Sequence, residues 1–149
     1  CAQRQHRILA DALPALALGG ILIYATCSYD VQEDEQIADW LVNEMGLIPQ
    51  AINVNNYAGI VETAAPISMA PGYRFYPDQI RGEGFFIAAF KKEKSITASH
   101  IPFKTKEASL EKLTKKMHTK ERARMIYNMF EIITGNAQNC CRICYISFL

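Results

Sequence analysis

The spacing of apolar residues predicts a helix followed by a buried strand at the start of the chain. Residues 2–16 carry apolar side chains at helical spacing, with polar side chains between them. Gly19 and Gly20 end this helix, because glycine takes the left-handed cap conformation without steric cost. The continuous apolar run over residues 21–26 is typical of a parallel strand that is covered on both faces.

A second helix, a short strand and a long loop are predicted next. Asp30 stands three residues before Glu33, a carboxylate variant of the capping box, and an apolar stripe at helical spacing follows as far as Gly46. Residues 47–54 have the pattern of a short strand. Residues 55–72 contain two prolines and two glycines and have weak periodicity, which favours a long loop.

The later part of the chain adds one clear strand and a basic helical pattern. A short extended piece at residues 73–76 precedes the strongest later strand, at residues 84–90. Residues 91–106 are predicted to form a linker, and residues 107–133 carry apolar side chains at helical spacing. The alternation of helices and strands before the linker indicates an α/β fold.

Composition fits one compact domain with an uneven distribution of charge. The chain has 149 residues, and its 50% apolar and 21% charged content exclude a disordered or fibrous protein. Residues 1–100 hold seven Lys and Arg against eleven Asp and Glu, whereas residues 101–149 hold nine against four. The basic last third suggests contact with a polyanion such as nucleic acid, although a solvated Lys-rich helix gives the same count more often. The candidate RNA contacts in this part are Lys112, Lys115 and Lys116.

The five cysteines favour free thiols over a disulfide framework. Their number is odd, and the chain has neither a signal-peptide pattern nor an apolar run long enough to span a bilayer. This usage is typical of the reducing cytoplasm, and no membrane contact is expected. Cys140, Cys141 and Cys144 lie close together, but they lack the paired spacing and the fourth ligand of a structural zinc site, so no metal is expected.

Cys27 is the residue most able to carry chemistry. It follows the predicted buried strand directly, at the edge where open α/β sheets present their ligands. A single cysteine at the end of an apolar strand is also a common small core residue, and spacing alone leaves both interpretations open.

Several stretches of the first 92 residues together resemble the Sun/Nop-type RNA cytosine-5 methyltransferases, and the bacterial RsmF-like branch most. The similar stretches are Gln5–Leu9, Gly19–Ser28 with its Thr-Cys motif, Glu33–Glu35 before an apolar helix, Arg74–Pro77, and Gly82–Ala88. The resemblance implies a partial class I, Rossmann-like sheet made of strands 5, 6 and 7 of that fold with flanking helices. It divides the chain into the later half of a methyltransferase domain at residues 1–94 and a basic, mainly helical segment at residues 95–149.

The resemblance also implies an enzyme that uses S-adenosylmethionine and acts on RNA, with ribosomal RNA expected. Cys27 matches the catalytic nucleophile of the family, whose thiolate adds to carbon 6 of cytosine so that carbon 5 can accept a methyl group. Arg74 either holds an RNA phosphate or forms a surface ion pair with Asp78 or Glu83. Gly82 and the residues after it lead into a strand rather than a helix, which favours a tight turn over a phosphate loop.

The chain departs from the family by lacking its cofactor-binding motifs. The family's glycine-containing cofactor loop, its acidic residue for the ribose and its Asp-x-Pro-Cys motif precede the Thr-Cys motif and would lie before Cys1. We therefore expect a fragment that is inactive alone, has no cofactor-binding residues of its own, and leaves the edge of the Cys27 strand open for want of the upstream half. Two alternatives remain: a non-catalytic RNA-binding module and an inactive truncated product.

Overall fold

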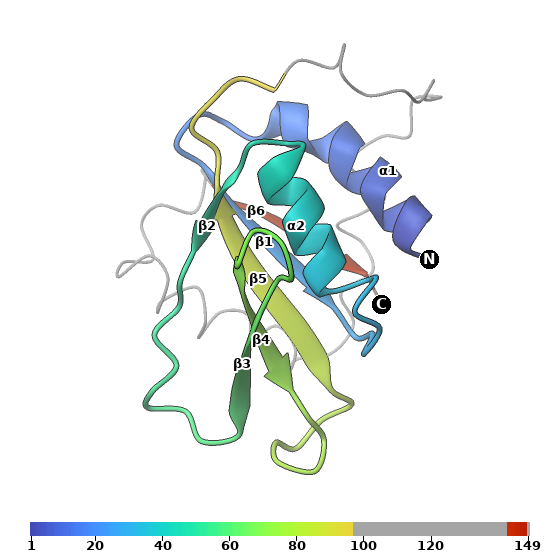
Figure 1. Cartoon of the computed structure of the whole chain (residues 1–149), viewed down its shortest axis with the longest axis vertical. Helices are drawn as coiled ribbons and strands as arrows, with labels where there is room; N and C mark the ends of the chain where they lie inside the picture. The colour runs from blue at the N-terminus through green and yellow to red at the C-terminus, as the bar shows by residue number, and fades with distance from the viewer. Residues whose placement is uncertain (97–142, 149) are drawn as a thin grey trace.

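A computed structural model describes residues 1–96 and 143–148 of the chain, in which helices lie against one face of a six-stranded sheet (Figure 1). The elements in chain order are α1 (Ala2–Ala12), the 3-10 helix η1 (Leu13–Ala15), β1 (Ile21–Thr26), α2 (Glu35–Asn43), β2 (Ile48–Gln50), β3 (Ile60–Ala64), β4 (Pro71–Phe75), β5 (Phe85–Lys91) and β6 (Ile143–Phe148). The mixture of helices and strands confirms the α/β class.

The sheet is built around β1 and β5. Its order is β3-β4-β5-β1-β6, and β2 pairs with the end of β5. β1 runs antiparallel to β5, with Tyr24 opposite Ala88, whereas β1 and β6 are parallel. α2 connects β1 to β2 and lies against one face of the sheet, and β2 then pairs antiparallel with β5 (Figure 1). The antiparallel β1–β5 pair with β2 beside it agrees with the expected partial Rossmann-like sheet.

Side chains of β1 pack on both faces of the sheet. Leu22 and Tyr24 belong to the cluster formed with α1 and α2, whose members include Leu9, Leu13, Ile37 and Leu41. Ile23 and Ala25 belong to a second cluster on the opposite face, with Ile52, Tyr73 and Ile87. Successive side chains of a strand point to opposite faces, so a strand buried on both faces needs an unbroken apolar run. The predicted strand at residues 21–26 and its burial on both faces are confirmed, but β1 is parallel only to β6 and antiparallel to β5.

The end of the first helix is held by a buried lysine. α1 ends at Ala12, and Pro14 lies in the 3-10 turn that follows. Nζ of Lys92, which is only 3% exposed, donates hydrogen bonds to the carbonyl oxygens of Leu13 at 2.8 Å and Leu16 at 2.7 Å. Carbonyl groups at a helix end lack intrahelical partners, and the ammonium group supplies them. The predicted linker at residues 91–106 therefore begins too early.

The second helix begins later than predicted. The carboxylate of Asp30 accepts a hydrogen bond from the amide of Gln32 at 2.9 Å, and its carbonyl accepts one from Glu33 at 2.8 Å. These bonds make a turn, because Asp bonds readily to the amide two residues further on, and α2 starts only at Glu35. The predicted end is confirmed, since Gly46 has a φ of +67° just after the helix.

The prediction of a long loop at residues 55–72 is wrong. β3 and the start of β4 lie in this stretch and pair as antiparallel strands, with Val61 opposite Arg74. The pattern was weak because the side chains of β3 are half-buried or exposed without a regular alternation.

The open strand edge is not found, and the basic, mainly helical segment contains a strand, β6. β6 pairs with β1 along its full length, from Ile21 opposite Ile143 to Thr26 opposite Phe148, so the edge of β1 has a partner. The predicted helix at residues 107–133 lies outside the described residues, and the division of the chain between residues 94 and 95 stays a prediction. No helix within the described ranges is long and apolar enough to cross a membrane.

Replacement of Lys92 tests the role of its ammonium group. Lys92→Met keeps the aliphatic stem and removes the donor of the Leu16 carbonyl, while the Leu13 carbonyl keeps only the amide of Leu16 at 3.2 Å, so we expect the free energy of unfolding to fall by about 1–3 kcal/mol. Urea denaturation followed by circular dichroism measures it. Lys94→Met, at an exposed position nearby, should change stability by less than about 0.5 kcal/mol. Equal effects of the two substitutions would contradict the assignment.

Candidate active site

The loop that follows β1 carries Cys27 and is folded by its own side chains. Oγ1 of Thr26 accepts a hydrogen bond from the amide of Ser28 at 3.1 Å, and Oγ of Ser28 accepts one from the amide of Asp30 at 3.0 Å. Hydroxyl groups compete in this way with regular structure and stabilise turns. Cys27 is a free, half-buried cysteine immediately after the last residue of β1. The structure therefore leaves the predicted nucleophile partly accessible at the end of the strand.

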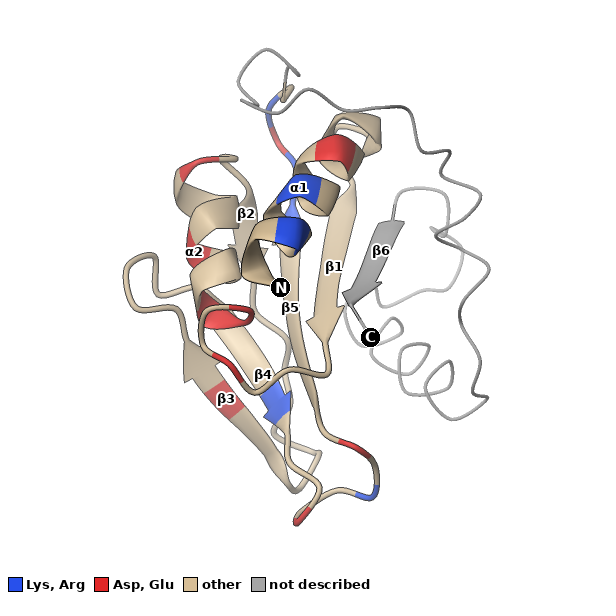
Figure 2. Cartoon of the chain, turned by 90° about the vertical axis from the view of Figure 1, so that its right-hand side faces the viewer, with Lys and Arg blue, Asp and Glu red and all other residues tan. Residues whose placement is uncertain are grey.

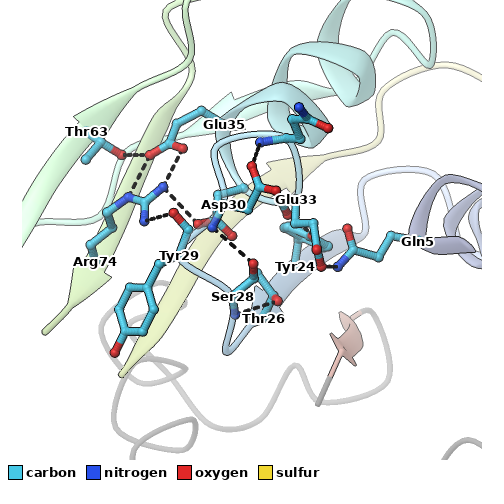
Figure 3. Close-up of polar contacts among 12 residues, drawn as sticks. Gln5, Tyr24, Thr26, Ser28, Tyr29, Asp30, Glu33, Glu35, Thr63 and Arg74 are labelled. Atoms are coloured by element: carbon cyan, nitrogen blue, oxygen red, sulfur yellow. Dashed lines mark hydrogen bonds and ion pairs between the residues drawn. The ribbon is translucent and has the colours of Figure 1, made fainter. Parts of the chain in front are cut away.

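Arg74 of β4 lies beneath this loop in a buried ion pair with α2. Its Nε and Nη2 donate to the two carboxylate oxygens of Glu35 at 2.9 and 2.6 Å, and Thr63 Oγ1 donates to the same carboxylate at 2.8 Å (Figure 3). A guanidinium matches a carboxylate in this two-bond geometry. Burial alone would raise the pKa of Glu35, but the hydrogen bonds from Arg74 and Thr63 outweigh it and hold the pKa below its usual value.

The remaining donors of Arg74 point at two further groups. Nη2 lies 2.8 Å from Oδ2 of Asp34, and Nη1 donates to the carbonyl oxygen of Tyr29 at 3.4 Å. The hydrogen bonds to Glu35 and the nearby charges raise the pKa of Arg74 further.

The predicted surface ion pair of Arg74 with Asp78 or Glu83 is wrong, because Arg74 is only 5% exposed and pairs with Asp34 and Glu35 instead. A guanidinium committed to these internal partners is poorly placed to hold an RNA phosphate, so we assign Arg74 a role inside the protein.

Asp34 is a buried carboxylate without hydrogen bonds. It is 0% exposed, and apart from the ion pair with Nη2 of Arg74 its side-chain oxygens have no hydrogen-bond partner in the described part of the chain. Burial raises the pKa of Asp34 to about 7, against the lowering effect of Arg74, and nearby Glu35, Glu33 and Asp30 raise it as well. Figure 2 shows the acidic residues gathered on α2 and the loop that precedes it.

The same loop is tied to the first helix. Nε2 of Gln5 in α1 donates to the carboxylate of Glu33 at 2.8 Å, and the hydroxyl of Tyr24 in β1 donates to the carbonyl oxygen of Glu33 (Figure 3). Burial raises the pKa of Tyr24, and Asp34 and Glu33 add to the effect. The hydroxyl therefore stays protonated and acts as a donor.

On its outer side the loop contacts the turn between β4 and β5. The rings of Tyr29 and Tyr76 are stacked, with centroids 5.9 Å apart and planes 6° from parallel, and the Tyr29 hydroxyl donates to the carbonyl of Glu83 at 2.9 Å. Gly84 has a φ of +89°, and a Cβ there would overlap the Tyr29 hydroxyl. These glycine-rich residues form a turn into β5, as predicted.

Sequence reasoning identified Cys27 but missed the residues that surround it. Tyr29, Asp34 and Glu35 were not singled out for a role, and the acidic run at Glu33–Glu35 entered only as part of the family resemblance. Lys112, Lys115 and Lys116, together with the side chains of the cysteines at 140, 141 and 144, lie outside what the structure describes. Within the described residues, no group of three or more His, Cys, Asp or Glu side chains could hold a metal ion.

Comparison with known proteins identifies the family. The family model described as 16S rRNA methyltransferase RsmB/F matches residues 1–91. The chain belongs to the RsmB/F methyltransferase family. This confirms the resemblance to Sun/Nop-type, RsmF-like methyltransferases.

Curated relatives of the RsmB/F family are much longer than this chain. Ribosomal RNA small subunit methyltransferase F of Vibrio parahaemolyticus is 26% identical over 132 residues, which cover 88% of this chain and 27% of that protein. The protein of the same description from Aliivibrio fischeri is 30% identical over 98 residues, or 65% of this chain and 20% of that protein. The chain thus spans about a quarter or less of these relatives.

A solved structure is also similar. The crystal structure of NSun6 from Pyrococcus horikoshii with SFG has a TM-score of 0.46 and 28% sequence identity, covering 62% of this chain and 22% of that one.

The segment matched by the RsmB/F family model contains every residue of the network described above, from Gln5 through Cys27 to Arg74. The stretches that carry the resemblance, at Gln5–Leu9, Glu33–Glu35 and Arg74–Pro77, are joined by hydrogen bonds to the loop that follows β1 or to the start of α2.

The pH dependence of stability tests the state of Asp34. Its pKa is higher in the folded chain than the ordinary 3.8, so ionisation opposes folding, and stability is lost as the pH rises from about 4 to about 7. Asp34→Asn removes this loss. Because one pKa unit corresponds to about 1.4 kcal/mol, we expect the variant to gain roughly 2–4 kcal/mol over the parent at pH 8 and little at pH 4.

Urea denaturation at both pH values measures this difference. Asp78→Asn, at an exposed position, is the matched control and should show no such pH dependence. A gain for Asp34→Asn that is the same at pH 4 and pH 8 would show that Asp34 is ionised at neither pH or at both.

Proposed function

We propose that this chain is part of an S-adenosylmethionine-dependent RNA cytosine-5 methyltransferase in which Cys27 is the nucleophile. The observation that carries the proposal is the position of Cys27: half-buried, directly after the central strand β1, and inside the segment that the RsmB/F family model matches. The relatives named above support ribosomal RNA as the substrate. The expected RNA contacts Lys112, Lys115 and Lys116 remain part of the proposal.

A thiol suits this reaction for a chemical reason. Carbon 5 of cytosine is too weak a nucleophile to take a methyl group unaided. Addition of the Cys27 thiolate to carbon 6 forms a carbon–sulfur bond and moves electron density to carbon 5. S-adenosylmethionine supplies an electrophilic sulfonium methyl group. Loss of the proton from carbon 5 then allows the thiolate to leave, and the product is 5-methylcytosine.

The chain's own residues contribute the nucleophile and its support. The target base of a stem must leave its stack to reach the thiol, because Cys27 lies at the end of a sheet strand and cannot enter a duplex. The described residues contain no glycine-rich loop that opens a helix, so we attribute cofactor binding to the part of the protein that the curated relatives have in addition. We therefore derive no step for the cofactor from this chain.

Covalent trapping tests the nucleophile. The chain is combined with the remaining part of the Vibrio parahaemolyticus relative and given RNA that contains 5-azacytosine, and the adduct is measured on a denaturing gel. We expect an adduct with the parent and with Cys1→Ala, an exposed free cysteine that serves as the control. Cys27→Ala should form at least about a hundredfold less adduct, because it lacks the attacking sulfur.

Two outcomes would contradict the proposal. Trapping by Cys27→Ala at the parent's level would exclude Cys27 as the nucleophile. RNA binding without an adduct in any variant would favour a non-catalytic RNA-binding module.

Calorimetry with S-adenosylmethionine tests where the cofactor binds. We expect the isolated 149-residue chain to show no saturable binding, because the family's cofactor loop and ribose-binding carboxylate have no counterpart in it. Addition of the remaining part of the Vibrio relative should restore binding. Saturable binding by the chain alone would refute the assignment of the cofactor site to another part of the protein.

A further inference from the structure

We propose that Tyr29 is a positioning residue that holds the Cys27 loop against the turn between β4 and β5 and so fixes where the thiol lies. The Cys27 loop is here residues 27–30. The catalytic consequence rests on the proposed function, whereas the effect on the loop does not.

The side chain of Tyr29 makes two contacts with the turn between β4 and β5. Its ring is stacked on Tyr76, at the end of β4, and its hydroxyl donates to the carbonyl of Glu83, just before β5. The turn leaves room for this hydroxyl only because Gly84 has no Cβ. A planar ring fixed at its face and at its tip has little freedom to rotate, so it holds the backbone from which it extends.

The main chain of Tyr29 is held from the opposite direction. Its carbonyl oxygen accepts a hydrogen bond from Nη1 of Arg74, whose other donors are engaged by Glu35. Arg74 is buried and cannot move without breaking that ion pair. Tyr29 is therefore fixed between a rigid buried group and a surface turn.

Among the described residues, the other positions of the Cys27 loop lack such ties, and the later residue Glu33 joins the following stretch to α1 and β1. The hydrogen bonds of Ser28 and Asp30 in the described chain join neighbours only two or three residues apart, which shapes the loop without attaching it to another element. The attachments of the Cys27 loop to β4 and to the β4–β5 turn are made by Tyr29. Because Tyr29 lies two residues after Cys27, loss of its contacts should let the thiol shift.

Alkylation of Cys27 by iodoacetamide in the 149-residue chain tests the attachment. The rate is measured by mass spectrometry of the Cys27 peptide, with the exposed Cys1 as the reference in the same sample. Tyr29→Phe keeps the stacked ring and loses one hydrogen bond, so we expect about a fivefold faster rate through easier opening of the loop. Tyr29→Ala loses both contacts, and we expect an increase of about tenfold or more.

Tyr57 provides the matched control. It is 45% exposed, as is Tyr29, and the described residues give its ring no hydrogen bond or ring contact. Tyr57→Phe and Tyr57→Ala should leave the Cys27 rate within about twofold of the parent, and the Cys1 rate should be constant throughout. Circular dichroism melting shows whether each variant is folded. An unchanged Cys27 rate in folded Tyr29→Ala overturns the proposal, and if that variant unfolds, an unchanged rate in Tyr29→Phe does so.

A second measurement separates positioning from RNA contact. In the combined protein used for trapping, Tyr29→Ala should lower the rate of adduct formation at saturating RNA by about tenfold and leave the Kd for RNA unchanged. Weaker RNA binding with an unchanged alkylation rate would instead make Tyr29 a stacking surface for a base and overturn the proposal. Failure of the proposed function is visible separately, as trapping by Cys27→Ala.

Discussion

The buried guanidinium of Arg74 is the constraint on which the rest of the site depends. A charge removed from water must be matched closely by opposite charge and by hydrogen-bond acceptors, and removal of one partner of such a pair commonly costs about 3–5 kcal/mol. Arg74 donates hydrogen bonds to Glu35 and to the carbonyl of Tyr29, and it forms an ion pair with Asp34. These groups belong to α2 and the loop before it, so the pairing fixes the helix, the loop and β4 relative to one another.

This arrangement places two acidic groups under different conditions beside the same cation. Glu35 receives hydrogen bonds from Arg74 and Thr63 and has a lowered pKa, whereas Asp34 is buried without hydrogen bonds and has a raised pKa. Full ionisation of both would put more negative charge around Arg74 than it can neutralise. The loop that carries Cys27 thus rests on a cluster whose charge changes near neutral pH.

Local pattern predicted the strands and helices of the first part but not the contacts between them. The apolar run at residues 21–26 identified β1 because burial on both faces demands it. The hairpin of β3 and β4 was missed because half-exposed strands have no clear period. The burial of Arg74 was missed because its partner lies 39 residues away, and spacing along the chain carries no information on such a pair. Cys27 was found through resemblance, and its exposure needed coordinates.

The pairing of β6 with β1 has a consequence for how the chain is made. Residue 21 pairs with residue 143, so most of the sequence must leave the ribosome before this edge of the strand finds its partner. At roughly 5–20 residues per second, synthesis of the stretch from the end of β5 to β6 takes several seconds. During that interval β1 can already pair with β5 on one side, while its β6 partner within this chain has not yet been made. Within this chain, the β1–β6 pairing is therefore one of the last contacts of the sheet to form.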